Sequence, residues 1–107
     1  ADTVRLEQVL VNLLQNALDA LHGVPHPRIT IELAAENERI FLSIVDNGPG
    51  IDPGIADRLF TPFATSRPSG LGLGLLISRD LMTDMGGKLR LMPSAHGAHF
   101  QIELRRA

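Results

Sequence analysis

Two asparagines stand four residues apart near the start of the chain. If this segment is helical, Asn12 and Asn16 share one face, and Gln8 and Asp19 continue the same polar strip. An amide oxygen can ligate a hard divalent cation while the NH2 group donates to phosphate, which suits a ligand that brings its own negative charge. The alternative is a solvated polar strip on an amphipathic helix, and these residues alone favour that alternative.

A second candidate site lies at the end of an expected strand, where the sequence reads Asp46-Asn47-Gly48-Pro49-Gly50. Gly48 and Gly50 permit the backbone to approach a planar ligand closely. An ionised Asp46 could accept a hydrogen bond from an exocyclic amine such as that of adenine. Asn-Gly and Pro-Gly are also common turn dipeptides, so the segment taken alone favours an ordinary turn.

Glycines alternate with leucines at the expected start of a second helix, in Gly70-Leu71-Gly72-Leu73-Gly74-Leu75. Backbone N–H groups at a helix N-terminus, free of side-chain bulk, form an anion site suited to a polyphosphate. The segment is not a dinucleotide fingerprint, because glycine is needed where Leu75 stands. The Gly-Lys pair of a P-loop could only be Gly87-Lys88, and there Leu89 replaces the required Ser or Thr, so the chain has no P-loop pattern. A glycine-rich structural bend remains an equal alternative.

The irregular segment before these glycines carries three further candidates. Arg67 could reach a terminal phosphate through a forked contact, although an arginine on an exposed loop is more often only solvated. Phe60 and Phe63 could anchor a lid or simply pack against the core.

The spacing of the four histidines loosely suggests metal ligation, but no carboxylate or cysteine cluster stands near them. Surface histidines are the better interpretation of His22, His26, His96 and His99.

Composition excludes several classes of function. The 107 residues fit one domain, and a net charge of -2 gives no basic field for nucleic acid or an anionic membrane. Without cysteine there is no disulfide framework, thiolate nucleophile or sulfur-ligated zinc. The apolar runs are too short for a membrane span or a signal peptide. We therefore expect a soluble, cytoplasmic domain with no direct membrane contact.

The elements that must position these residues follow from periodicity. Apolar residues recur every three or four positions over residues 3–21, which predicts an amphipathic helix ended by Gly23 and Pro25. Residues 28–34 alternate as a half-buried strand and 39–45 are apolar on both faces, so the two predict a hairpin. Residues 46–74 follow neither period. A second helical stripe then ends at Gly86-Gly87, and strands are expected at 88–92 and 98–104. This order predicts an α+β fold, a two-layer α/β sandwich whose mixed, largely antiparallel sheet is covered on one face by helices.

The order of these motifs resembles one protein family. It runs from a helical Asn-x3-Asn-Ala through strand-Asp-x-Gly-x-Gly, Phe-x-Pro-Phe and Gly-x-Gly-x-Gly-Leu to a closing Gly97-Ala98-His99-Phe100 strand. This resembles the catalytic, ATP-binding domain of bacterial sensor histidine kinases, in the superfamily shared by DNA gyrase B, the heat-shock chaperone of about ninety kilodaltons and the mismatch-repair protein. Residues 6–20 and 59–75 are most similar to the nitrogen-regulatory and dicarboxylate-sensing kinases. The implied fold is the Bergerat-type ATP-binding fold over residues 1–107, lacking its upstream strands.

The resemblance also implies roles for individual residues. Asn16 would hold Mg2+, Asn12 would assist at the phosphates, and Asp46 would bind the adenine amine of ATP. Gly48 and Gly50 would admit the ring, and Arg67 would stand where many relatives carry a lysine. Residues 51–69 would form the ATP lid, with Phe60 in it. The polyphosphate would be wrapped by the segment containing Gly70, Leu71, Gly72, Leu73, Gly74 and Leu75.

The implied activity is transfer of the γ-phosphoryl group of ATP to a histidine on a separate dimerisation domain, with a response regulator as further partner. The implied location is the cytoplasm, alone or as the cytoplasmic part of a membrane-anchored sensor. Two rivals remain open: an ATP hydrolase of the same superfamily, and a degenerate module that only binds nucleotide. In the hydrolases a glutamate general base stands four residues before the metal asparagine, where this chain has Asn12. Two further differences from the family are Asp19 in place of a basic residue and His99 before the closing Phe100.

Overall fold

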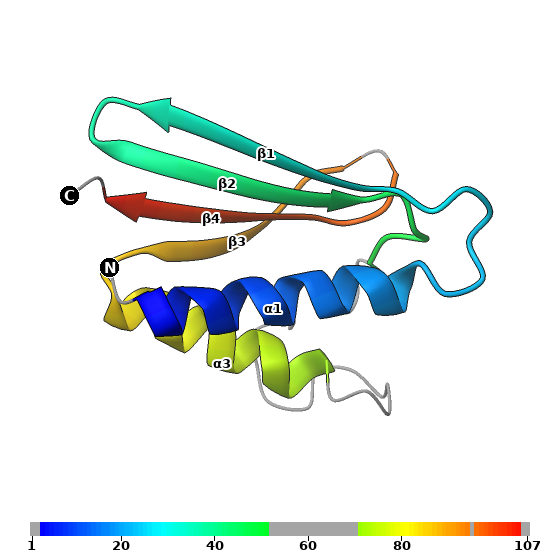
Figure 1. Cartoon of the computed structure of the whole chain (residues 1–107), viewed down its shortest axis with the longest axis horizontal. Coiled ribbons are helices and arrows are strands. Elements are labelled where there is room, and N and C mark those ends of the chain that lie inside the picture. The colour runs from blue at the N-terminus through cyan, green and yellow to red at the C-terminus, as the bar shows by residue number, and fades with distance from the viewer. Residues whose placement is uncertain (1–2, 52–70, 95, 106–107) are drawn as a thin grey trace.

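A computed structural model describes residues 3–51, 71–94 and 96–105. The elements within these residues are α1 (Thr3–Ala20), β1 (Ile29–Glu36), β2 (Arg39–Asp46), α3 (Leu71–Asp84), β3 (Lys88–Met92) and β4 (His99–Arg105). The four strands form one sheet in the order β1-β2-β4-β3, and each neighbouring pair is antiparallel. Both helices lie on the same face of this sheet (Figure 1). The α+β two-layer architecture expected from the sequence is confirmed, with antiparallel pairing throughout the described strands.

The core fills the space between the sheet and the two helices. Each helix contributes a stripe at intervals of three or four residues, as the periodicity predicts. The strands contribute alternate residues from the facing side of the sheet. The buried apolar residues of this cluster are Val9, Leu13, Ala17, Ile44, Leu75, Met82, Leu89, Ala98, Phe100 and Ile102.

The end of α3 shows how the sequence sets an element boundary. Gly86 adopts φ = 76°, a conformation that favours glycine. The N–H of Gly87 donates to the carbonyl of Met82 at 2.8 Å, and the N–H of Gly86 donates to the carbonyl of Thr83 at 3.0 Å. These two bonds form a Schellman cap, which confirms the predicted stop at Gly86-Gly87. The helix begins at Leu71, within the Gly70–Leu75 segment that was expected to open it, so Gly72 and Gly74 belong to its first turn.

Strand β1 departs from the sequence prediction. Ile31 and Leu33 point to the same side as Ile44 and Leu42 of β2, yet they are 56% and 72% exposed. The reason is the placement of the helices, because α1 packs on β2 and α3 packs on β3. The edge strand β1 therefore forms with its predicted alternation, but it is exposed rather than half-buried. No helix in the described part of the chain has both the length and the apolar character needed to cross a membrane.

Candidate functional site

The carboxylate of Asp46 is fixed at the end of β2. Asp46 is buried, and its Oδ1 accepts hydrogen bonds from the backbone N–H of Gly48 at 2.9 Å and of Ala98 at 3.2 Å. The N–H of Asp46 in turn donates to the carbonyl of Ala98 at 3.0 Å. Within the described residues no hydrogen bond reaches Oδ2. One carboxylate oxygen is therefore anchored by the backbone, and no described residue occupies the other, which can accept a hydrogen bond from a ligand.

Glycines surround this carboxylate because side chains would not fit. A Cβ added to Gly48 would lie 2.9 Å from the carbonyl oxygen of Ala20, and one added to Gly50 would lie 3.1 Å from the carbonyl oxygen of Gly97. At Gly97, which has φ = 70°, an added Cβ would overlap the backbone of Asp46. The sequence analysis placed Gly97 only in the closing strand. The signal that could have identified it is a glycine immediately before the strand that returns beside Asp46.

Asn47 has a local structural task beside the site. Its Oδ1 accepts a hydrogen bond from the N–H of Arg28 at 2.7 Å, and its Nδ2 donates to the carbonyl of His26 at 2.9 Å. These bonds tie the end of β2 to the segment that enters β1. The Asp46–Gly50 segment is thus a turn held by its side chains, and its geometry also keeps the Asp46 carboxylate in place.

The polar strip on α1 divides into two parts. Gln8 and Asp19 are exposed, and Asp19 Oδ1 accepts a hydrogen bond from Gln15 Nε2 at 3.0 Å. Asn12 and Asn16 are half-buried, and the contact with Ser78 places Asn12 on the side of α1 that faces α3. The interpretation as a wholly solvated strip is therefore wrong for these two asparagines.

Asn12 and Asn16 differ in their partners. Asn12 Nδ2 donates to Ser78 Oγ of α3 at 3.0 Å. The Nδ2 atom of Asn16 is buried and has no hydrogen-bond partner among the described residues. A buried amide N–H without a partner costs about 1–3 kcal/mol, so an acceptor supplied by a ligand would remove that cost. A phosphate oxygen is such an acceptor, and the residues present therefore fit a polyphosphate.

Ser78 was not among the site residues predicted from the sequence. Leu75, Ser78 and Met82 lie three and four residues apart on α3, and all three are fully buried. A hydroxyl residue in the middle of an apolar helical stripe was the available signal. Leu75 itself lies in the core, which favours a role in anchoring α3 over direct contact with a ligand.

The glycine-rich segment is described only in part. The backbone of Leu71, Gly72, Leu73 and Gly74 forms the first turn of α3. The residues expected to act beside it, Phe60, Arg67 and Gly70, lie outside the described residues, as does the expected lid except for Ile51. Ile51 packs against the core.

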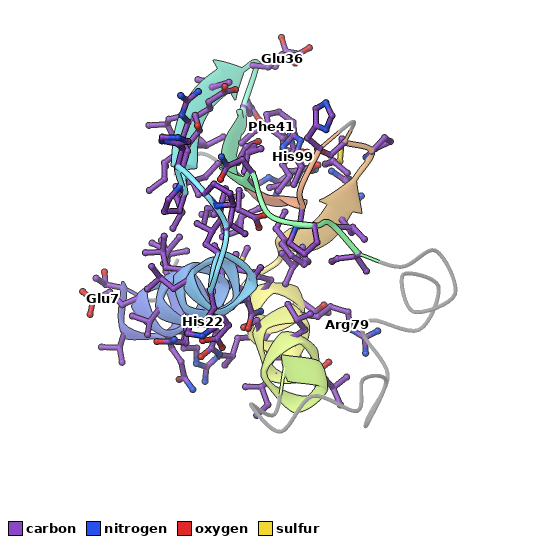
Figure 2. The ribbon with its side chains drawn as sticks, turned by 90° about the vertical axis from the view of Figure 1, so that its right-hand side faces the viewer. Glu7, His22, Glu36, Phe41, Arg79 and His99 are labelled. Atoms are coloured by element: carbon purple, nitrogen blue, oxygen red, sulfur yellow. The ribbon has the colours of Figure 1, made fainter. Side chains whose placement is uncertain are left out.

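The histidines do not gather at this site. His22, His26 and His96 are exposed, as expected for surface residues. His99 is half-buried, and its Nε2 is buried without a hydrogen-bond partner among the described residues. Phe41 and His99 lie on the face of the sheet that the helices leave uncovered (Figure 2).

An ion-pair cluster of the buried Glu103 with two partly exposed arginines lies on that same outer face. Glu103 Oε1 is 2.7 Å from Arg90 Nη1, and Glu103 Oε2 is 3.3 Å from Arg39 Nη1. The hydrogen bond from Arg90 lowers the pKa of Glu103 against the opposing effect of burial, and the charges of Arg90, Lys88 and Arg39 lower it further.

The two halves of the candidate site adjoin each other. Gly48, two residues beyond Asp46, lies against the carbonyl of Ala20, one helical turn beyond Asn16. A carboxylate with one free oxygen and an amide with an unpartnered N–H thus lie on neighbouring segments. This combination suits a ligand with an amine at one end and anionic oxygens at the other.

Comparisons with known proteins all point to one family. The family model described as histidine kinase-, DNA gyrase B-, and HSP90-like ATPase matches residues 1–107. The C4-dicarboxylate transport sensor protein DctB of Rhizobium meliloti is 43% identical over 104 residues, covering 97% of this chain and 17% of that protein. The sensory histidine kinase/phosphatase NtrB of Escherichia coli O157:H7 is 36% identical over 112 residues, covering 96% of this chain and 32% of that protein.

A solved structure shares the whole fold. The nucleotide-free catalytic domain of histidine kinase ThkA superposes with a TM-score of 0.87 at 34% identity, covering 99% of this chain and 69% of that one. These similarities confirm the resemblance drawn from the motifs. The chain spans less than a third of the length of the two curated relatives.

Proposed function

Because the chain belongs to the family of histidine kinase-, DNA gyrase B-, and HSP90-like ATPases, we propose that it is the ATP-binding catalytic domain of a two-component sensor histidine kinase. In this proposal it transfers the γ-phosphoryl group of ATP to a histidine on a separate dimerisation domain. That domain and the receiver domain of a response regulator are the proposed partners, and the cytoplasm is the proposed location. The whole-length relatives named as sensors and sensory kinases support this assignment.

The observation that carries the proposal is the fixed carboxylate of Asp46. Its Oδ1 is held by the N–H groups of Gly48 and Ala98, which leaves Oδ2 as an acceptor for the exocyclic amine of adenine. Burial excludes competing water, so this hydrogen bond is stronger than it would be at an exposed site. Gly48 and Gly50 let the backbone around Asp46 pack closely against Ala20 and Gly97, and in this proposal the same segment admits the adenine ring.

The phosphates of ATP are assigned to the helix side of the site. The unpartnered Nδ2 of Asn16 would donate to a phosphate oxygen, and the backbone N–H groups at the start of α3 would face the same chain of phosphates. Asn16 Oδ1 is the proposed ligand of Mg2+, which neutralises phosphate charge when it is bound. Arg67 remains the proposed contact for the terminal phosphate.

Asn12 favours a kinase over a hydrolase. An amide cannot take a proton from water near neutral pH, and loss of a positioned general base typically costs about 10² to 10⁴ in rate. Glu7 cannot replace it, because it is exposed on a part of α1 that points away from α3 (Figure 2). The chain's own residues therefore bind and orient the nucleotide, and an acceptor histidine must come from elsewhere.

Calorimetric titration of the chain with Mg-ATP and with a non-hydrolysable analogue tests binding. A second assay adds a histidine-bearing dimerisation domain, in cis or in trans, and measures phosphohistidine. We expect binding, negligible phosphate release by the chain alone, and phosphohistidine only when the second domain is present. Steady-state phosphate release that is lost in Asn16→Ala would indicate a hydrolase. Binding without either reaction would indicate a module that only binds nucleotide.

A further inference from the structure

We propose that Ser78 is a positioning residue that sets the orientation of the Asn12 carboxamide toward the nucleotide. The proposal deepens the nucleotide-binding role given above and rests on it. Ser78 Oγ is 3.0 Å from Asn12 Nδ2, and the contact joins two helices across 66 positions of the sequence. Among the described residues, this bond links the polar strip of α1 to the apolar stripe of α3.

Ser78 places a buried hydroxyl in an otherwise apolar stripe of α3. Its neighbours on the stripe, Leu75 and Met82, are fully buried apolar residues, and Ser78 is 0% exposed between them. A buried hydroxyl destabilises the fold unless it is hydrogen-bonded, whereas alanine at this position would carry no such cost and has a higher helix propensity. The bond from Asn12 is the contact through which this hydroxyl reaches the polar strip of α1.

The bond determines which end of the Asn12 carboxamide faces the site. A helical serine can donate its own proton to the carbonyl four residues before it, which leaves Oγ free to accept from Asn12. The NH2 end of Asn12 is then held against α3, and Oδ1, the end suited to a cation bound with the phosphates, points away from Ser78. Without Ser78 the amide can rotate and present either end, so part of the population would face the ligand with the wrong group.

Asn16, one turn further along α1, shows how an amide differs when no described side chain holds its NH2 group. Its Nδ2 is buried and has no hydrogen-bond partner among the described residues, so in this proposal it gains one when a ligand binds. Asn12 is already oriented before any ligand arrives. Preorganisation of this kind raises affinity because the ligand does not have to order the side chain.

A double-mutant cycle on nucleotide affinity tests this role. We expect Ser78→Ala to weaken Mg-ATP binding about two- to tenfold, the range for one lost hydrogen bond. In an Asn12→Ala background the same change should cost less than about twofold, because the group that it positions is gone. Ser78→Thr, which retains the hydroxyl, should recover most of the affinity. The matched control is Ser43→Ala, which removes a buried hydroxyl from the outer face of the sheet and should leave affinity unchanged.

A second measurement reports on the contact without nucleotide. The side-chain NH2 resonances of Asn12 should shift in the NMR spectrum of Ser78→Ala and remain in place in Ser43→Ala. Equal losses of affinity from Ser78→Ala in both backgrounds, or unchanged affinity with unshifted resonances, would overturn the proposal. If the unmodified chain fails to bind Mg-ATP, the proposed function fails. If it binds and Ser78→Ala binds equally well, only the role of Ser78 fails.

Discussion

The candidate site has a strand half around Asp46 and a helix half around Asn12 and Asn16, and the two differ in how their polar groups are paired. Around Asp46, in the strand half, the carboxylate is held in place by the backbone, because its Oδ1 accepts two hydrogen bonds and the N–H of Asp46 donates to Ala98. Glycines occupy the remaining space around it. On α1 the arrangement is incomplete, since Asn16 Nδ2 is buried and has no partner among the described residues. The strand half holds its carboxylate in position before a ligand binds, whereas the helix half contains a buried N–H group, that of Asn16, which a ligand would pair.

This difference separates stability from binding. Substitutions in the strand half should damage the fold and the affinity together, because the same backbone bonds serve both. Substitutions in the helix half should damage affinity while leaving the fold intact or more stable, because an unpartnered group there opposes folding. Each variant below is therefore measured twice, by thermal unfolding and by titration with Mg-ATP.

The largest effect is expected at Gly97. Gly97→Ala places a Cβ into the backbone of Asp46 at a residue with φ = 70°, so the fold should lose about 2–5 kcal/mol from conformational strain and overpacking together. For a domain of this size the melting temperature should fall by at least about 10 °C. ATP binding should disappear as Asp46 is displaced.

Gly86→Ala is the matched control for this variant. Gly86 has φ = 76°, but nothing lies within 4 Å of an added Cβ. It should therefore cost only the conformational term of about 1–2 kcal/mol and leave ATP affinity unchanged. Equal melting temperatures for the two variants would show that the close approach to Asp46 is unimportant.

Two substitutions of Asp46 separate the structural role of its Oδ1 from the ligand-binding role proposed for its Oδ2. Asp46→Ala leaves the N–H groups of Gly48 and Ala98 without their acceptor and should lose about 1–3 kcal/mol of stability as well as detectable ATP binding. Asp46→Asn keeps an oxygen for both N–H groups but places an NH2 group where Oδ2 stood. It should unfold within about 1 kcal/mol of the unmodified chain and still bind ATP at least tenfold more weakly. Normal affinity in Asp46→Asn would contradict the adenine assignment.

The helix half should respond in the reverse sense. Asn16→Leu replaces the amide by an apolar group of similar shape, which removes the unpartnered Nδ2. The free energy of unfolding should stay the same or rise by up to about 1 kcal/mol, while Mg-ATP binding falls at least tenfold. Titrations with and without Mg2+ should show that most of the lost affinity depends on the metal. A destabilised Asn16→Leu would mean that Asn16 is a structural residue.

The sequence predicted this asymmetry only in part. The spacing of Asn12 and Asn16 placed them on one face of a helix, and the Asp-x-Gly-x-Gly order placed Asp46 beside flexible backbone. Both expectations concern neighbours along the chain, where periodicity and turn chemistry are informative. The partners of these residues, Ser78 and Ala98, lie 66 and 52 positions away. Contacts at that separation depend on how the helices and strands pack together, which local pattern does not encode.

Strand β1 shows the same limit in the fold. Its alternation of Ile29, Ile31 and Leu33 predicted a strand correctly, and β1 pairs with β2 along its full length. Burial was predicted wrongly for Ile31 and Leu33, because alternation reports that one face is apolar and not that a helix covers it. Only the positions of α1 over β2 and α3 over β3 decide that question.

The smallest effect is expected far from both halves, at Glu103, and it tests whether destabilisation alone can lower affinity. Arg90 lowers the pKa of Glu103 in the folded state, so the unfolded chain takes up a proton more readily than the folded one. The stabilisation is therefore complete above the ordinary value of 4.5 and is lost as the pH falls through the folded pKa. Glu103→Gln should melt lower at neutral pH and show a flatter loss of stability below pH 4.5.

The exposed Glu32→Gln, on the same face of the sheet, should keep the acid dependence of the unmodified chain. Because Glu103 touches neither half of the site, Mg-ATP affinity at neutral pH should be unchanged. A weaker affinity in Glu103→Gln would show that the losses expected from Gly97→Ala and Asp46→Ala reflect general destabilisation, and the division between the two halves would fail.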